Sequence, residues 1–387
     1  MHPIVKKIAL SCINALGKCF DLLPVQKTII FESSPDYGCN AWPVFLRLRK
    51  ELPEYKMVWC VGGNTAVPAG VDDTFAFESH NPLKRLKELY YTHTARAIVF
   101  CNRELKKYRK SQTALFLCHG SKTKKTRGVY EVDAGVDHIN VQSHFFDDII
   151  TYEYNCGKEK LVYLGYPRCD WFYGSTEGVK AALGLEPDCG FRVWLPTFRK
   201  HKSNRPDYQM DTEKFASMGM PLISTPEQLM QLDTFLAQRN QYLIYKPHPA
   251  QDISGLKAAK AERVKIISDR DLAEAGLQLN QVLAAADGLI TDYSSVFFDY
   301  LLADKPIITT VDDIDEWKKM TGFAFDLDAF LDIATTRAGS LDQLMEAIDA
   351  PDSKQAGRKE IREKTNMHYD GGSAERVAQF IKEKIGA

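Results

Sequence analysis

Short apolar stretches alternate with helical stretches through the first half of the chain, and this alternation constrains the fold more than any other feature. Four of the apolar stretches have the length of a buried strand, namely residues 28–31, 57–61, 97–100 and 114–118. Between them, residues 42–52 and 82–95 have the periodicity of amphipathic helices. Strands that alternate with helices build a parallel sheet covered by helices. The first half therefore predicts an α/β domain with a doubly wound sheet.

The same pattern starts again after a middle segment rich in Gly, Pro and acidic residues. Further strand-like stretches lie at residues 193–196, 242–247, 264–268, 288–291 and 306–309. We expect two doubly wound Rossmann-like domains, residues 26–180 and 181–365, that face each other across a cleft. This is the glycosyltransferase-B arrangement, and ligands of such sheets bind at the carboxyl ends of the strands. The periodicity of residues 373–385 predicts a helix within 366–387 that packs across both domains.

The N-terminal residues predict a short amphipathic helix within residues 1–25. Its apolar stripe fits either an anionic membrane surface or a face of the protein itself.

Charge is distributed unevenly along the chain. Residues 1–128 hold 21 Lys and Arg against 10 Asp and Glu, whereas residues 129–387 hold 29 Lys and Arg against 41 Asp and Glu. The asymmetry indicates an anionic partner for the first part of the chain, unless the charge serves solubility alone.

Composition is that of a cytoplasmic globular protein. No apolar run approaches the roughly 20 residues that a membrane-spanning helix needs. The nine cysteines form no C-x-x-C pair and no zinc-type cluster with histidine. We therefore expect reduced thiols, no metal, no cofactor and no nucleic-acid partner.

The segment ITDYSSVFFD, residues 290–299, follows a predicted strand and opens a predicted helix. Asp292 stands in the turn, and Ser294 and Ser295 begin the helix. A helix start presents backbone N–H groups and roughly half a positive charge, so it attracts phosphate, and a serine hydroxyl adds a donor. Simple capping of the helix by these serines is the alternative. We interpret the segment as a phosphate-binding site.

Two more segments of the second domain place cationic side chains after strands. In YKPHP, residues 245–249, Lys246 ends a strand and two prolines hold His248 in an extended loop. His248 can then donate a hydrogen bond to a phosphate oxygen, whereas the alternative is an ordinary surface or core histidine. In LPTFRK, Arg199 follows a strand and suits a phosphate or a base. We assign all three residues to the donor site. His248 is also predicted to be catalytic, because it would touch the donor phosphates in both the ground state and the transition state.

The strongest candidate for proton transfer lies in LCHGSKTKKTR, residues 117–127. His119 leaves the end of a predicted strand, and Gly120 permits a tight turn. An imidazole with an unperturbed pKa of about 6.5 can take a proton from a hydroxyl. The residues that follow suit a phosphorylated acceptor. The predicted acceptor site comprises Gly120, Ser121, Lys122 and Lys124.

A last phosphate-type segment is DGGSAERV, residues 370–377, where Ser373 and Arg376 fall in the first turn of a helix. Together with GYPRCD at residues 165–170, these segments resemble the CDP-glycerol glycerophosphotransferase family of teichoic acid primases and polymerases. The resemblance covers residues 90–380, and its motifs are specific only in combination. It implies the glycosyltransferase-B fold and transfer of polyol phosphate from a CDP-polyol, with release of CMP.

The resemblance also implies roles for individual residues. It implies that His119 is the general base, from the H-G-T-P motif of the family, which only His119 and Gly120 match here. Ser121 and Lys122 replace Thr and Pro, and this departure bears on the choice of acceptor. The family's donor-phosphate residues map onto His248, Ser294 and Ser295.

We therefore predict a peripheral enzyme on the inner face of the cell membrane. It transfers glycerol phosphate, or a related polyol phosphate, from a CDP-polyol to a hydroxyl of an anionic lipid-linked or oligosaccharide acceptor. The product belongs to a teichoic-acid-like polymer or a capsule polysaccharide. Two alternatives stay open: a nucleotide-sugar transferase or epimerase with the same fold, or a non-catalytic polymer-binding protein.

Overall fold

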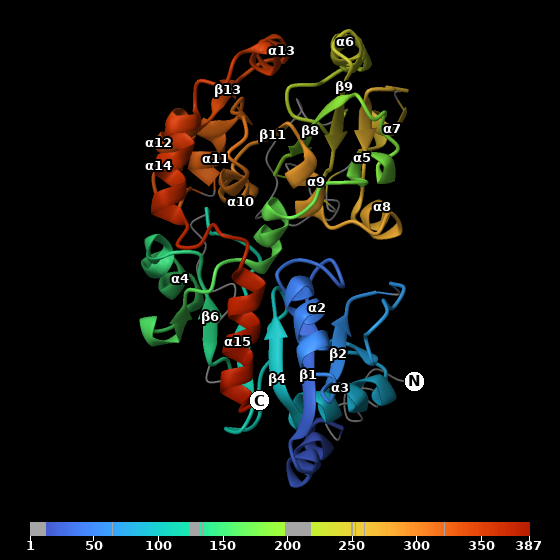
Figure 1. Cartoon of the computed structure of the whole chain (residues 1–387), viewed down its shortest axis with the longest axis vertical. Coiled ribbons are helices and arrows are strands. Elements are labelled where there is room, and N and C mark those ends of the chain that lie inside the picture. Colours follow the sequence, from blue (N-terminus) through green and yellow to red (C-terminus); the bar gives the residue numbers. More distant parts are fainter. Residues whose placement is uncertain are drawn as a thin grey trace. The chain divides into compact units, whose positions relative to one another are not determined.

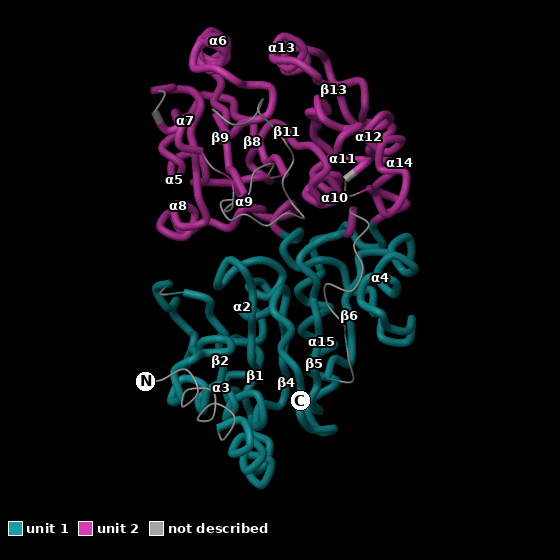
Figure 2. Tube along the Cα trace, turned by 180° about the vertical axis from the view of Figure 1, so that it is seen from behind, with its two compact units in different colours: residues 1–121, 127–170, 366–387 teal, residues 122–126, 171–365 magenta. Residues whose placement is uncertain are grey.

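The structure, a computed structural model, consists of two compact units (Figures 1 and 2). The first unit comprises residues 1–121, 127–170 and 366–387, and the second comprises residues 122–126 and 171–365. The described residues are 13–63, 65–123, 132, 135–197, 218–248, 251, 253–258, 260–320 and 322–387. Two predicted site residues, Lys124 and Arg199, lie outside them, as does most of the predicted N-terminal helix.

A parallel sheet forms the centre of the first unit, and its described strands follow the order β3-β2-β1-β4-β5-β6-β7. These strands are β1 (Gln26–Glu32), β2 (Lys56–Val61), β3 (Asp73–Ala76), β4 (Ala95–Phe100), β5 (Thr113–Phe116), β6 (His138–Asn140) and β7 (Leu161–Val162). The four predicted strands of this unit are confirmed within a few residues. The sequence analysis missed β6 and β7, because two or three residues show no apolar pattern, and it missed β3, whose sequence DTFA has no run of apolar residues beyond Phe75 and Ala76.

The helices of the first unit are α2 (Ala41–Glu51), α3 (Pro82–Thr94), α4 (Asp147–Tyr154) and α15 (Ser373–Ile385), with the short helices η1 (Lys18–Leu22), η2 (His144–Phe146), η3 (Lys158–Lys160) and η4 (Pro167–Tyr173). Alternate residues of the central strands, such as Phe31 and Trp59, share one core with α2 and α15. The residues between them, such as Ile30 and Val58, are equally buried on the opposite face. Burial on both faces is typical of parallel sheets.

Local sequence explains where α3 begins. Asn81 caps α3, since its side chain accepts hydrogen bonds from the amides of Leu83 (3.0 Å) and Lys84 (3.3 Å). Helix α15 has the predicted bounds, and its apolar stripe lies in the core of the first unit, beside α2. Its packing across both domains stays a prediction.

The second unit contains another parallel sheet, whose described strands follow the order β10-β9-β8-β11-β12-β13. They are β8 (Gly190–Leu195), β9 (Gln241–Tyr245), β10 (Val264–Ile266), β11 (Gly288–Thr291), β12 (Ile307–Thr310) and β13 (Thr336–Ala338). All five predicted strands are present, and β13 was missed. Trp194, Leu243 and Ile290 from the middle strands lie in one buried core.

The helices of the second unit are α5 (Val179–Ala182), α6 (Pro226–Ala237), α7 (Ser254–Ala258), α8 (Asp269–Glu274), α9 (Leu279–Ala285), α10 (Val296–Tyr300), η7 (Leu301–Ala303), α11 (Ile314–Met320), α12 (Leu327–Ala334), α13 (Leu341–Asp349) and α14 (Gln355–Thr365). Helix α6 begins with a reciprocal cap between Thr225 and Gln228. In the described part of the chain, every helix is too short or too polar to cross a bilayer. The predicted α/β class with two doubly wound Rossmann-like domains is confirmed.

Candidate functional site

The order of the strands changes direction between β1 and β4 in the first unit. Ligands of doubly wound sheets bind at the carboxyl ends of the strands next to such a switch point. The buried carboxylate of Glu32 at the end of β1 accepts hydrogen bonds from the amides of Cys101 (3.1 Å), Asn102 (2.9 Å) and Arg103 (3.0 Å) after β4. Burial raises the pKa of Glu32 despite these three bonds. Glu32 thus fixes the loops that form this edge.

His119 follows β5 at the same edge of the sheet, and its side chain is exposed. The backbone before it is fixed, because the side-chain amide of Asn40 donates to the carbonyls of Leu117 (3.2 Å) and Cys118 (2.9 Å). The imidazole Nδ1 lies 3.6 Å from the sulfur of Cys39. The Arg168 guanidinium contacts both the Cys39 sulfur, at 3.4 Å, and the His119 carbonyl. An exposed histidine with an ordered backbone and a polar partner on one ring nitrogen can exchange a proton through the other.

The predicted acceptor residues around His119 divide between the two units. Gly120 and Ser121 are buried in the first unit, where the Ser121 hydroxyl donates to the side chain of Gln142. Lys122 belongs to the second unit. The next residue, Thr123, donates its hydroxyl to the carbonyl of Tyr293 (3.0 Å). Thr123 and Tyr293 both belong to the second unit, so this bond attaches residues 122–126 to the DYSS motif of that unit.

The second unit has its own switch point, between β8 and β11, and two predicted residues lie there. The buried carboxylate of Asp292 accepts bonds from the Thr197 amide (2.8 Å) and hydroxyl (2.7 Å), so it joins the ends of these strands. Ser294 and Ser295 are half-buried at the start of α10. The Ser295 side chain makes no capping hydrogen bond, and the Ser294 hydroxyl lies 3.5 Å from the amide of Val296. The hydroxyls of Ser294 and Ser295 therefore contribute little to capping α10.

Lys246 and His248 follow β9, the strand next to β8, so they share the carboxyl edge with Asp292. The Lys246 ammonium is nearly buried and pairs with Asp269 at 2.8 Å. The His248 side chain is exposed. The structure thus brings Lys246, His248, Asp292 and the two serines to neighbouring strand ends of one sheet.

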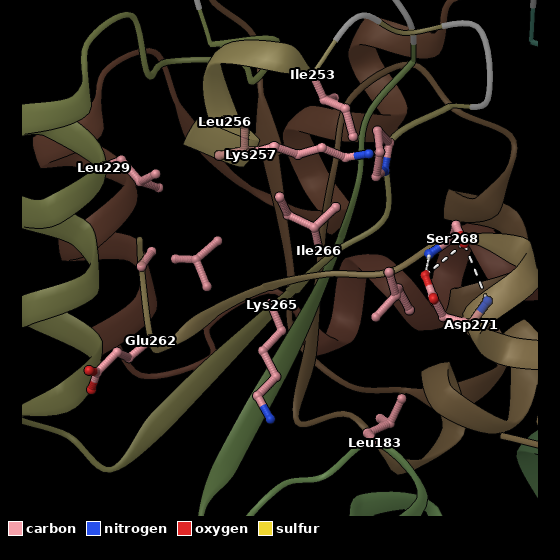
Figure 3. A pocket seen from close by; sticks show the side chains of 14 residues that line it. Leu183, Leu229, Ile253, Leu256, Lys257, Glu262, Lys265, Ile266, Ser268 and Asp271 are labelled. Carbon is pink, nitrogen blue, oxygen red and sulfur yellow. Dashed lines mark hydrogen bonds between the residues drawn. The ribbon is translucent and has the colours of Figure 1, made fainter. Parts of the chain in front are cut away.

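A pocket of about 760 Å³ lies on the β10 side of this unit (Figure 3). Pro247 borders it between the two candidate residues, and aliphatic side chains such as Leu256 and Ile266 line it with Lys257 and Lys265. At one end Ser268 and Asp271 cap α8 reciprocally. Among the described residues that line the pocket there is no predicted site residue.

Ser373 and Arg376 belong to the first unit, whereas the motifs that share the second sheet belong to the other unit. The amides of Ser373 and Ala374 donate to the carboxylate of Asp170 at 3.0 and 2.7 Å. Arg376 forms two bonds with Asp370, at 2.8 and 2.9 Å. A phosphate at the start of α15 would compete with both carboxylates. Donor binding by Ser373 and Arg376 stays a prediction.

Sequence reasoning missed Cys39, Asn40 and Arg168 as neighbours of His119. Arg168 stands in the GYPRCD segment, whose likeness to the family was noted without a role for the residue. Nothing in the local sequence distinguishes Cys39 from the other cysteines.

A sequence model of the family described as CDP-glycerol:poly(glycerophosphate) glycerophosphotransferase matches residues 19–383. The chain belongs to this family. The resemblance inferred from the motifs is thereby confirmed.

Within this glycerophosphotransferase family, the teichoic acid ribitol-phosphate primase of Bacillus spizizenii is 28% identical over 225 residues, which are 58% of this chain and 53% of that protein. The teichoic acid poly(glycerol phosphate) polymerase of Bacillus subtilis is 25% identical over 338 residues, covering 79% of this chain and 42% of that one. The chain spans about half the length of these two relatives. A solved structure of the wall teichoic acid polymerase TagF aligns with a TM-score of 0.73 at 20% identity, over 99% of this chain and 96% of that one. The glycerophosphotransferase chain shares its fold, as expected for the glycosyltransferase-B class.

Proposed function

We propose that the protein transfers a polyol phosphate, in the first place glycerol phosphate, from CDP-glycerol to a hydroxyl of a lipid-linked or cell-surface polymer precursor. CMP is the second product, and the polymer is a teichoic-acid-like chain or a capsule polysaccharide. The observation that carries this proposal is the family match over residues 19–383. The positions of His119 and the DYSS serines at strand ends support it.

In the proposed reaction, His119 is the general base. Its Nε2 takes the proton of the acceptor hydroxyl, whose oxygen forms a bond to the phosphorus that carries the polyol. The bond from that phosphorus to the CMP oxygen breaks, and CMP leaves with the electron pair. Such phosphoryl transfer needs positioning and charge stabilisation more than covalent catalysis.

The donor phosphates are assigned to the second unit. The hydroxyls of Ser294 and Ser295 and the imidazole of His248 donate hydrogen bonds to them, while Arg199 supplies charge. Lys246 and Asp292 act mainly by holding the strand ends, because each already has a charged or polar partner. Gly120, Ser121, Lys122 and Lys124 are assigned to the acceptor, whose anionic chain the basic first part of the protein attracts.

A peripheral position on the inner face of the membrane is part of the proposal. Leu22 in η1 is 87% exposed and Leu83 in α3 is 78% exposed, beside exposed Lys18 and Lys84 in the same elements. Exposed apolar and cationic groups together suit an anionic lipid surface.

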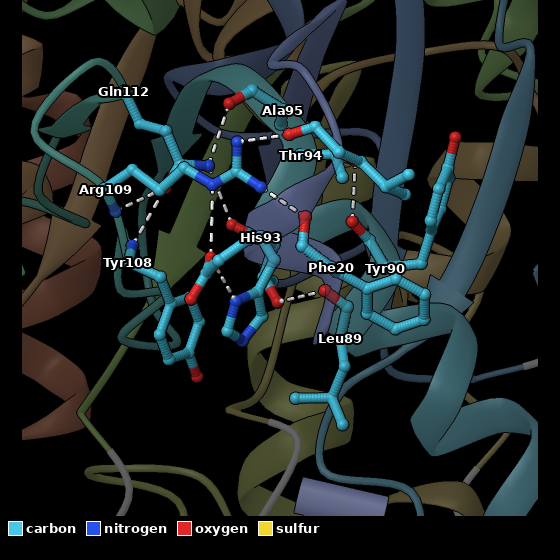
Figure 4. A network of polar contacts seen from close by, with 12 residues as sticks. Phe20, Leu89, Tyr90, His93, Thr94, Ala95, Tyr108, Arg109 and Gln112 are labelled. Carbon is cyan, nitrogen blue, oxygen red and sulfur yellow. Dashed lines mark hydrogen bonds and ion pairs between the residues drawn. The ribbon is translucent and has the colours of Figure 1, made fainter. Parts of the chain in front are cut away.

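Figure 4 shows the polar contacts that attach η1, which carries Leu22, to the rest of the first unit. Arg109 donates to the carbonyls of Phe20 and Leu23 and to the carboxylate of Asp21, which also contacts His93 at 2.9 Å. Burial opposes ionisation of Asp21, but the bonds from His93 and Arg109 outweigh it and lower its pKa.

We expect the variant Leu22→Ser/Leu83→Ser to sediment less with anionic vesicles than the wild type. The control Met230→Ser changes an exposed apolar side chain of the second unit and should sediment normally; equal loss in both variants contradicts the membrane assignment.

Incubation with CDP-glycerol, CDP-ribitol and a UDP-sugar, each with a lipid-linked acceptor, tests the proposed function. We expect CMP release with at least one CDP-polyol and none of the corresponding nucleotide with the UDP-sugar. Turnover of the UDP-sugar would identify a nucleotide-sugar enzyme instead. Binding of the acceptor without turnover of any donor would identify a polymer-binding protein.

A further inference from the structure

The thiol of Cys39 is the group that contacts the ring of His119. Cys39 lies in the loop between β1 and α2, and His119 follows β5, so both belong to the carboxyl edge of the first sheet. The distance of 3.6 Å from Sγ to Nδ1 is normal for a hydrogen bond to sulfur. Within the described part of the chain, no carboxylate is bonded to this ring. A catalytic histidine is commonly oriented by a carboxylate at that position.

The surroundings of Cys39 favour a thiolate. The hydrogen bond from the Cys101 thiol, the guanidinium of Arg168 and the imidazole of His119 together hold the pKa of Cys39 well below its ordinary value, although burial opposes this. Burial raises the pKa of Cys101 well above the ordinary value, so this neighbour stays a neutral donor. A cation beside a thiol is the usual cause of a stable thiolate.

The backbone leaves the two side chains little freedom to separate. Cys39 has a φ of 53°, a left-handed conformation that is uncommon for a residue with a side chain. The next residue, Asn40, bonds the two carbonyls before His119 and accepts from the amide of Arg168 at 3.2 Å. One side chain therefore connects the loop of Cys39, the end of β5 and the segment of Arg168.

We propose that Cys39 is a positioning residue for His119, whose Nδ1–H donates to the Cys39 thiolate and whose Nε2 is thereby left to accept the proton of the acceptor hydroxyl. The thiolate also balances the positive charge that the ring acquires when Nε2 takes this proton. Arg168 keeps the sulfur charged and holds the His119 carbonyl, so that one cation serves both residues. The inference rests on the proposed function for the role of His119 in transfer, but the thiolate–imidazole pair itself does not depend on it.

The first test measures the thiol without any turnover. The ultraviolet absorbance of thiolate is recorded against pH for the wild type and for Cys39→Ser, and the difference gives the titration of Cys39. The same difference for Cys19→Ser is the control, since Cys19 is exposed. We expect Cys39 to titrate at clearly lower pH than Cys19, and to move upward in His119→Asn. Equal titration of the two cysteines would overturn the proposal.

The second test measures the reaction. Cys39→Ser keeps a small polar group without the charge, and Cys39→Asp restores a negative charge on another atom. We expect Cys39→Ser to lower kcat about 10- to 100-fold, the effect typical of removing a partner that orients a functional histidine, with an unchanged KM for CDP-glycerol. The acid limb of the pH profile of kcat should also change in Cys39→Ser. Cys39→Asp should recover much of the lost kcat. Cys19→Ser should behave as the wild type.

The two tests separate the inference from the function on which it rests. Melting temperatures of the variants show whether the fold is retained. A folded Cys39→Ser variant with the wild-type kcat and pH profile would overturn the positioning role. If the wild type releases no CMP from any CDP-polyol, the proposed function fails, and the thiolate titration still decides whether Cys39 and His119 form the pair.

Discussion

The carboxyl edges of the two sheets differ in how their polar groups are used. At the edge of the first sheet, His119 is exposed and contacts a thiol that lies beside the guanidinium of Arg168. At the edge of the second, Asp292 accepts hydrogen bonds from Thr197, and Lys246 forms an ion pair with Asp269. Among the described residues of this edge, His248 is exposed, and Ser294 and Ser295 are half-buried. This difference agrees with the proposed division, in which His119 of the first edge takes the proton and the second edge binds the donor phosphates.

The largest expected effect comes from removing the base. His119→Ala should lower CMP release by about 10²- to 10⁴-fold, the usual contribution of general base catalysis. The matched control is His144→Ala, which removes another exposed histidine of the first unit and should leave the rate unchanged. Near-normal turnover of His119→Ala with a proper acceptor would show that His119 is not the general base.

A smaller effect is expected at the second edge. Ser295→Ala should weaken binding of CDP-glycerol by about 10- to 100-fold, because a hydrogen bond to a charged group contributes about 1.5–3 kcal/mol. The control Ser340→Ala removes a serine that does cap its helix, with its hydroxyl 3.3 Å from the amide of Gln343. That variant should lose stability and keep its donor affinity. Unchanged affinity in Ser295→Ala would place the donor phosphates elsewhere.

The smallest effect concerns Arg376, which the structure pairs with Asp370 in the first unit. The hydrogen bond from Arg376 lowers the pKa of Asp370 to about 2. The pair therefore stabilises the fold above the ordinary pKa of 3.8, and its contribution is lost as the pH falls through about 2. Asp370→Asn should lower the free energy of unfolding near neutral pH by less than about 1 kcal/mol, because the Asp370 side chain is 60% exposed, and the difference should vanish in strong acid.

Urea unfolding of this variant beside Asp188→Asn, an exposed carboxylate of the second unit, makes the measurement. CDP-glycerol affinity measured on the same samples adds a second readout. A rise in affinity on release of Arg376 would assign this arginine to the donor site rather than to the fold of the first unit.

Sequence patterns predicted nine of the strands, because each of these stretches is rich in apolar and β-branched residues. They predicted the bounds of α15 from its periodicity. They did not predict β6 or β7, whose two or three residues carry no period. The motifs gave His119, His248 and the serines, since each stands directly after a strand. The contact between Cys39 and His119 joins residues 80 positions apart, and the cap of α15 by Asp170 joins residues 203 apart. Such contacts depend on how loops pack, which a local pattern does not contain.

The most direct test of the division between the two edges is the affinity of His119→Ala for CDP-glycerol, measured by calorimetry beside Ser295→Ala. A residue that acts on the acceptor hydroxyl contributes to the transition state and little to donor binding. We predict that His119→Ala binds CDP-glycerol within about threefold of the wild type, a difference well below 1.4 kcal/mol, while it releases almost no CMP. Loss of donor affinity in His119→Ala as large as that in Ser295→Ala would contradict the account.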